Sequence, residues 1–130
     1  MPDRSGRCYT GGGFPDPMII EKRRLGEDTL LTVEGVIKLG ESAEFFARTL
    51  DRVLAEDGRH VFIDMAKINY MDSTGIGELV GYLARFREVK RRLVLIHPAE
   101  RVRRLLEVAQ IADLFPMFDT LEAAREGSPA

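Results

Sequence analysis

The residues in this sequence whose types and spacing could do chemistry lie close together in one short segment. The segment runs Asn69-Tyr70-Met71-Asp72-Ser73-Thr74-Gly75-Ile76-Gly77-Glu78-Leu79. We expect it to be a loop that enters a helix, with Ser73 and Thr74 at the helix start. Backbone N–H groups at a helix start have no intrahelical partners. The segment could therefore cap the helix, bind an anion or carry a phosphoryl group.

Helix capping alone could explain the polar residues of this segment. Asp, Ser and Thr are favoured N-cap residues, and each contributes about 0.5–2 kcal/mol. No capping box forms, however, since Ile76 and Gly77 stand three residues after Ser73 and Thr74. Glycine in a helix interior costs about 0.8–1 kcal/mol relative to alanine, and a cap does not need it. Gly75 and Gly77 are better explained by the close approach of another backbone, a phosphate or a partner.

A phosphoryl group on Ser73 would have two electrostatic effects. It would lie at the positive end of the helix dipole, which favours anions. It would also add about −1.5 to −2 charges beside Asp72, and near Asp64 if that residue ends its strand close by. The helix dipole therefore allows the modification, and the added charge makes the surface strongly acidic. Together they describe a surface switch that changes what can dock without unfolding the domain.

Enzymatic interpretations of the same residues do not agree with the residue types and spacings that the known motifs require. In Gly75-Ile76-Gly77-Glu78-Leu79-Val80-Gly81 the third glycine comes one residue late for a dinucleotide-binding fingerprint. A serine hydrolase motif fails because Met71 occupies the position where a glycine is needed. His60 and His97 are the only possible histidine bases, and with Cys8 they lack the spacing of metal ligands. We therefore expect no enzyme, no cofactor and no metal site.

Two further features allow functional interpretations. Asp64 at a strand end could suggest a phosphoacceptor aspartate, but the first strand lacks the acidic pair of a receiver domain. A cationic cluster comprises Arg85, Arg87, Lys90, Arg91 and Arg92. We expect it to be a solvated face and strand entry, with docking of an acidic partner as its functional alternative.

Composition limits the class of protein. The chain has 130 residues, a formal net charge of −2 and a single cysteine, so it cannot form an intramolecular disulfide. No apolar run approaches the roughly 20 residues that span a bilayer, and no signal core follows the N-terminal charges. The spread of Lys and Arg gives no dense positive field for nucleic acid. We expect a cytoplasmic protein with no direct nucleic-acid binding and no membrane insertion, whose oligomeric state the sequence leaves unknown.

The elements that must position the segment follow from hydrophobic periodicity. Strands are predicted at 18–24 and 29–34, joined by a turn at Gly26 and ended by Gly35, and further strands at 61–63 and 93–96. Helices are predicted at 41–57 and 74–89, and another from Pro98. A last strand at 114–118 and a helix at 121–125 close the chain. Residues 1–17 are expected to be a flexible tail, 18–126 the domain, and 127–130 a C-terminal tail. The order predicts an α/β fold with one mixed sheet, an N-terminal β-hairpin, parallel central strands and helices packed on them.

The sequence resembles the STAS domains, and among them the bacterial anti-sigma factor antagonists. The resemblance rests on Asp64-Met65 followed by Ile68-Asn69-Tyr70-Met71-Asp72-Ser73-Thr74-Gly75-Ile76-Gly77, and it runs from about Met18 to Arg125. In that family the Ser directly after the Asp is the phosphoacceptor. Its kinase is an anti-sigma factor, and a PP2C-type phosphatase removes the phosphate.

The resemblance implies roles for individual residues. Ser73 would be phosphorylated, and the unmodified protein would bind the serine kinase and free the sigma factor. The partner-binding surface would comprise Asp64, Asp72, Thr74, Gly75, Ile76 and Gly77. One departure concerns Lys38, which stands where many antagonists carry an acidic residue. A scaffold subunit of a signalling or lipid-transport assembly, without reversible phosphorylation, is therefore the alternative.

Overall fold

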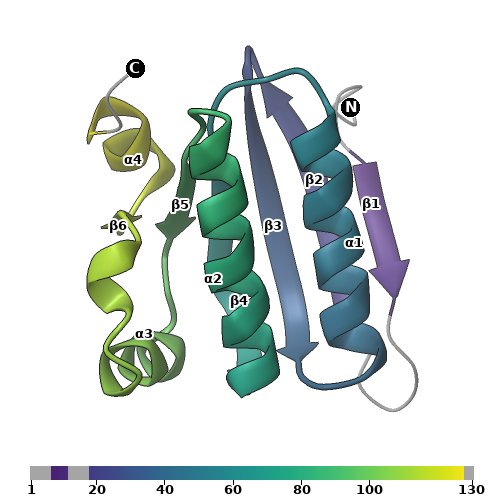
Figure 1. Ribbon diagram of the computed structural model, residues 1–130, viewed down its shortest axis with the longest axis vertical. Coiled ribbons are helices and arrows are strands. Elements are labelled where there is room, and N and C mark those ends of the chain that lie inside the picture. The colour runs from purple at the N-terminus through teal and green to yellow at the C-terminus, as the bar shows by residue number, and fades with distance from the viewer. Residues whose placement is uncertain (1–6, 12–17, 128–130) are drawn as a thin grey trace.

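The computed structural model describes residues 7–11 and 18–127, which form one six-stranded sheet. The strands lie in the sheet in chain order, as Figure 1 shows. Neighbouring strands pair antiparallel from β1 to β3 and parallel from β3 to β6. Their bounds are β1 (Arg7–Gly11), β2 (Met18–Leu25), β3 (Asp28–Ile37), β4 (Val61–Met71), β5 (Leu93–Ile96) and β6 (Met117–Phe118).

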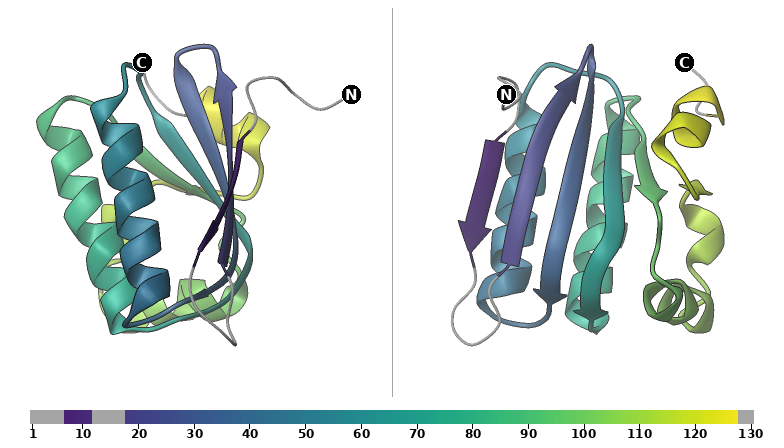
Figure 2. Two further views of the ribbon diagram at one scale, coloured as in Figure 1. Left: turned by 90° about the vertical axis from the view of Figure 1, so that its right-hand side faces the viewer. Right: turned by 180° about the vertical axis from the view of Figure 1, so that it is seen from behind.

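Helices cover the two faces of the sheet unequally. The long helices α1 (Glu41–Ala55) and α2 (Ser73–Glu88) lie side by side across one face (Figures 1 and 2). On the other face the short helix α4 (Leu121–Gly127) covers only β5 and its neighbours. Helix α3 (Glu100–Val108) and a 3₁₀ turn (Ala112–Leu114) connect β5 to β6.

The main core lies between the sheet and the two long helices. Alternate residues of the strands point into it, as expected for strands with one face against helices. The largest fully buried side chains include Phe46 of α1 and Phe86 of α2. A smaller cluster on the other face joins Phe62, Val94 and Ile96 to Ala124 of α4. Burial on both faces explains why the central strands begin with continuous apolar runs.

The predicted mixed sheet with a leading hairpin and parallel central strands is confirmed. The hairpin joins β2 to β3, and Gly26 at its turn has a φ of 67°. Helices α1 and α2 and strand β5 lie where hydrophobic periodicity predicts them. Helix α3 begins at Glu100, two residues after Pro98. The last strand is shorter than predicted, since it begins at Met117 and Leu114 belongs to the 3₁₀ turn.

Two strands extend further than the sequence predicts, and both extensions bear on the site. Gly35 does not end its strand: it lies inside β3 with a φ of 118°, beside a shift in register, and pairing resumes through Ile37. Strand β4 likewise continues to Met71, so Asn69 to Met71 belong to a strand and not to a loop. The two extensions pair with each other, Val36 opposite Tyr70 and Ile37 opposite Met71.

The N-terminal strand β1 was not predicted. Arg7 to Gly11 pair antiparallel with β2, within the segment that we expected to be a tail. The edge of a sheet offers unpaired backbone groups to any chain beside it, so pairing does not require an apolar sequence. The remaining residues of that predicted tail, 1–6 and 12–17, lie outside the described residues, as do residues 128–130 of the predicted C-terminal tail.

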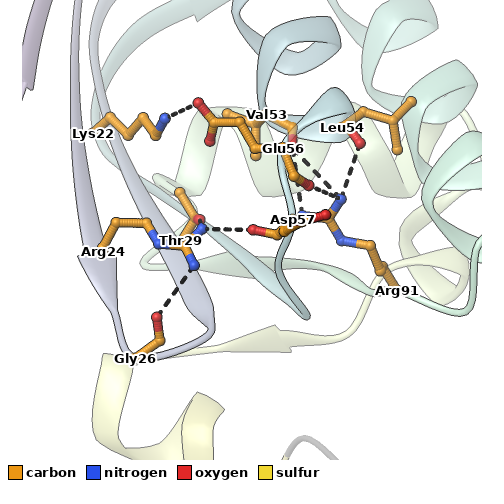
Figure 3. Close-up of polar contacts among 9 residues, drawn as sticks. All are labelled: Lys22, Arg24, Gly26, Thr29, Val53, Leu54, Glu56, Asp57 and Arg91. Carbon is orange, nitrogen blue, oxygen red and sulfur yellow. Dashed lines mark hydrogen bonds and ion pairs between the residues drawn. The ribbon is translucent and has the colours of Figure 1, made fainter.

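The cationic cluster is not wholly a solvated face, because Arg91 is buried. Its guanidinium donates to the carbonyl oxygens of Leu54 at 3.1 Å and Glu56 at 3.2 Å, at the C-terminal end of α1 (Figure 3). Its Nε donates to the Arg59 carbonyl at 2.6 Å. Burial lowers the pKa of Arg91 from its ordinary value. Arg91 therefore caps α1 from a distant part of the chain.

Candidate functional site

Ser73 is the first residue of α2, and its side chain is exposed. The start of α2 lies at the lower end of the molecule in Figure 1, beside the loop that joins β3 to α1. The prediction that Ser73 and Thr74 begin the helix is confirmed. Ser73 does not cap it, since the N-cap residue is Asp72. The Ser73 hydroxyl is thus presented at the positive end of a helix whose cap is made by its neighbour.

The Asp72 carboxylate joins two segments of the site. Its Oδ1 accepts a hydrogen bond from the Gly75 backbone N–H at 3.0 Å, and its Oδ2 accepts from the Leu39 N–H at 2.9 Å. The Asp72 backbone N–H donates to the Ile37 carbonyl at 3.1 Å. Partial burial acts to raise the pKa of Asp72, but the hydrogen bonds from Leu39 and Gly75 outweigh it, and the pKa lies below its ordinary 3.8. Asp72 therefore fixes the β3–α1 loop against the start of α2.

Gly75 is required by packing inside the chain. A Cβ there would lie 2.7 Å from Met71 Cγ and 2.8 Å from Ile37 Cγ2, so α2 can approach the ends of β3 and β4 only without a side chain. The close approach predicted for this glycine is thus made within the chain, by the side chains of Met71 and Ile37 and by the Ile37 carbonyl at 3.1 Å, and it needs no ligand. Gly77 differs, because a Cβ at that position would meet nothing within 4 Å.

The other predicted partner-binding residues of the helix start lie around Ser73. Thr74 and Ile76 are half-buried, and Gly77 is exposed. The Ile76 N–H donates to the Asp72 carbonyl at 3.0 Å, which forms the first helical turn. The structure therefore brings Asp72 to Gly77 together at the helix start, but buried Gly75 is not part of the surface, and the role of the other residues in binding stays a prediction.

Asp64 does not belong to this surface. It lies in the interior of β4, seven residues before Met71, where its Oδ1 accepts a hydrogen bond from the Ala66 N–H at 3.1 Å. At about 3.3 Å per residue, seven strand residues span more than 20 Å. We expected Asp64 at a strand end near Ser73, and that placement is wrong because β4 continues far beyond the apolar run that predicted it.

Two exposed apolar side chains, one in the loop beside the site and one near the end of β4, were not predicted from the sequence. Leu39 is 77% exposed in the β3–α1 loop, and Tyr70 is 45% exposed near the end of β4. Leu39 is held close to Ser73 by the hydrogen bond to Asp72. No local sequence pattern predicts that Leu39 lies beside Ser73, because this position depends on a hydrogen bond between residues 33 positions apart in the chain.

The histidines lie away from Ser73. His60 directly precedes β4, at the opposite end of that strand, and its buried ring accepts a hydrogen bond through Nδ1 from the Arg92 N–H at 3.3 Å. His97 follows β5, which ends opposite Asp64. In the described ranges 7–11 and 18–127, no three His, Cys, Asp or Glu residues group as metal ligands would. Within those ranges no helix is long and apolar enough to cross a membrane.

Comparisons with known proteins show which family and fold this chain resembles. The family model of the STAS domain matches residues 20–124. An anti-sigma-B factor antagonist of Staphylococcus epidermidis is 33% identical over 79 residues, which cover 58% of this chain and 73% of that protein. The anti-sigma factor antagonist SpoIIAA in its unphosphorylated form superposes with a TM-score of 0.70 at 16% identity, covering 85% of this chain and 99% of that one. The Bacillus cell fate determinant SpoIIAA in the phosphorylated form gives a TM-score of 0.65 at 16% identity, over 82% and 96% of the two chains.

Proposed function

The chain belongs to the STAS domain family, and we propose that it is an anti-sigma factor antagonist whose binding state is set by phosphorylation of Ser73. In the unmodified state it docks a serine kinase that is also an anti-sigma factor. Phosphate on Ser73 prevents docking, and a PP2C-type phosphatase restores it. The protein acts by binding and not by catalysis, in the cytoplasm, without contacting nucleic acid or inserting into a membrane.

The observation that carries this proposal is the exposed Ser73 side chain on a helix start that other residues hold in place. Asp72 makes the cap, and Gly75 makes the close packing against β3 and β4. A phosphoryl group can therefore be added to Ser73 without displacing a cap or a core contact. Backbone N–H groups at the first turn favour the added negative charge.

The surroundings of Ser73 support a switch in docking. Exposed Leu39 offers apolar area that a partner can cover, and the hydrogen bond from its N–H to Asp72 fixes it beside the site. Adding about two negative charges next to the Asp72 carboxylate makes this area strongly acidic. A partner that buries the unmodified surface would have to desolvate that charge, so affinity falls without a change of fold.

Affinity for the cognate kinase tests the proposal. We expect Ser73→Asp to weaken binding at least tenfold in titration calorimetry, and Ser73→Ala to bind like the unmodified chain. Ala84→Asp is the matched control, since it adds the same charge at an exposed position further along α2. Equal affinities for Ser73→Asp and the unmodified chain would contradict the switch.

Lys38 favours a second candidate, a scaffold subunit of a signalling or lipid-transport assembly. It places a cation in the β3–α1 loop, next to the residue that Asp72 binds. A scaffold would form a stable large assembly in sedimentation, and Ser73→Ala and Ser73→Asp would leave that assembly unchanged. The switch predicts instead that Ser73→Asp releases the partner.

A further inference from the structure

A small cavity lies at the end of α2 that is far from Ser73. Its volume is about 240 Å³, and it opens between the last turn of α2, the start of β5 and the segment before β6. Leu83, Leu93 and Pro116 form its apolar wall. Four cationic residues complete the lining, namely Arg87, Lys90, Arg91 and Arg92. An apolar hollow is therefore surrounded by side chains of one charge sign.

The cations of this cavity differ in what they can offer a ligand. Arg91 is buried, and its guanidinium is directed to the carbonyls at the end of α1 (Figure 3). Arg87, Lys90 and Arg92 are exposed. Arg87 donates one hydrogen bond to the Leu114 carbonyl at 3.1 Å. Three solvent-facing cations thus remain to contact an anionic ligand.

These three cations also lack carboxylate partners within the described part of the chain. Over residues 7–11 and 18–127, no ion pair within 4.0 Å joins Arg87, Lys90 or Arg92 to an acidic side chain. Some other exposed arginines do have carboxylate partners, such as Arg85 with Asp51 at 3.0 Å and Arg104 with Glu100 at 3.5 Å. Three neighbouring cations without counter-charges raise the local positive potential, although the whole chain has a net charge of −2.

Size and donor placement favour a protein segment over a small molecule. Pockets for small ligands measure about 300–1,000 Å³ and carry converging polar groups. This cavity is smaller, and the donors of its one buried cation are used by backbone carbonyls. One apolar side chain would suit the hollow, with charges of opposite sign on either side to meet the exposed cations.

We propose that this cavity docks an acidic segment of a protein partner. An apolar side chain of the segment enters between Leu83, Leu93 and Pro116, and flanking carboxylates pair with the surrounding cations. Helix α2 has 16 residues between the two ends, which at 1.5 Å per residue gives about 24 Å. The Debye length in physiological salt is only about 8 Å. Docking here is therefore independent of phosphorylation at Ser73.

A titration with a defined peptide tests this docking site. The probe is acetyl-Glu-Asp-Leu-Asp-Glu-amide, added to the full ¹⁵N-labelled chain at 150 mM salt and followed by amide chemical shifts. We expect saturable shifts at residues 83, 87 and 90–93, and unchanged affinity in Ser73→Asp. The neutral acetyl-Gln-Asn-Leu-Asn-Gln-amide should bind at least tenfold more weakly, as should a probe with Ala in place of Leu.

A charge reversal separates the proposed site from general attraction. Lys90→Glu should weaken binding of the peptide probe at least tenfold. The control Arg125→Glu, at an exposed position of α4, should leave the affinity within twofold of that of the unmodified chain. The amide spectrum of each variant reports whether the fold is intact. The proposal is overturned by an absence of saturable shifts, by equal loss in both variants, or by inorganic phosphate or a short DNA duplex binding there as tightly as the peptide.

Discussion

The two ends of the paired long helices are held by opposite charges. At the end that carries Ser73, the Asp72 carboxylate accepts from the backbone N–H groups of Leu39 and Gly75. At the other end, the Arg91 guanidinium donates to the backbone carbonyls of Leu54 and Glu56. Each charge compensates backbone groups that a helix end or loop leaves without partners.

The difference between these ends lies in what remains exposed. Arg91 is buried, and the network around it includes the ion pair of Lys22 with Glu56 and the bond from Arg24 to the Asp57 carbonyl at 3.1 Å (Figure 3). At the other end Asp72 is only half-buried, and the adjacent Ser73 side chain faces solvent. One end therefore stabilises the fold, while the other keeps a modifiable group accessible on a fixed backbone.

Replacing Arg91 should have the largest effect on stability. Arg91→Met leaves the carbonyls at the end of α1 without their charged donor, and hydrogen bonds to charged groups contribute about 1.5–3 kcal/mol. We expect the free energy of unfolding, measured in urea, to fall by about 2–4 kcal/mol. The control Arg92→Met, at an exposed neighbour, should change it by less than about 0.5 kcal/mol. Equal losses would contradict the role of Arg91 as a cap.

The two glycines of the site should respond in opposite directions. Gly75→Ala forces a Cβ against Met71 and Ile37, and overpacking of this kind costs about 1–3 kcal/mol. Gly77→Ala meets open space, so helix propensity should stabilise the protein by up to about 1 kcal/mol. Thermal unfolding of the pair measures both changes. A similar loss of stability in both variants would contradict the packing of the helix start described above.

Removing the Asp72 carboxylate should have a moderate, pH-dependent effect. Asp72→Ala loses an N-cap, which contributes about 0.5–2 kcal/mol, and also the bond to Leu39. Since the pKa of Asp72 is lower in the folded state than its ordinary 3.8, its stabilisation is present above pH 4 and is lost as the pH falls through the folded pKa. Urea unfolding at pH 7 and pH 3 should therefore show a smaller difference between variant and parent at the lower pH.

Changing Ser73 should have the smallest effect on stability. Ser73→Asp places an acidic group in the first turn of α2, where the helix dipole favours it by about 0.3–1 kcal/mol. We expect the free energy of unfolding to stay within about 0.5 kcal/mol of the parent. A large destabilisation would mean that the loss of docking proposed for this variant reflects unfolding.

Sequence patterns predicted best the elements whose apolar residues form a continuous run or recur at a regular spacing. Leu93 to Ile96 form β5 as predicted, because all four side chains are buried. The second half of β4 was missed because Ala66, Lys67, Asn69 and Tyr70 are exposed there, so no apolar run marks it. The misplacement of Asp64 follows directly, since its position was inferred from the end of that run.

The features that were not predicted from the sequence depend on contacts between residues that are distant in the chain. Arg91 stands in a charged run that favours solvent, yet its partners lie more than 30 positions away in the chain. The bond from Leu39 to Asp72 is likewise invisible to a local pattern. The order Asp-Ser-Thr-Gly was enough to predict a helix start, but not which side chain caps it or what Gly75 packs against.

Phosphate mapping on the full chain tests the central claim most directly. The chain is incubated with its cognate kinase and ATP, and the phosphorylated residue is identified by tandem mass spectrometry, with Ser73→Ala as the control. The account predicts a single phosphate on Ser73 and none on the variant, although the variant still binds the kinase. Phosphate on Thr74 or elsewhere, or unchanged phosphorylation of Ser73→Ala, would contradict it.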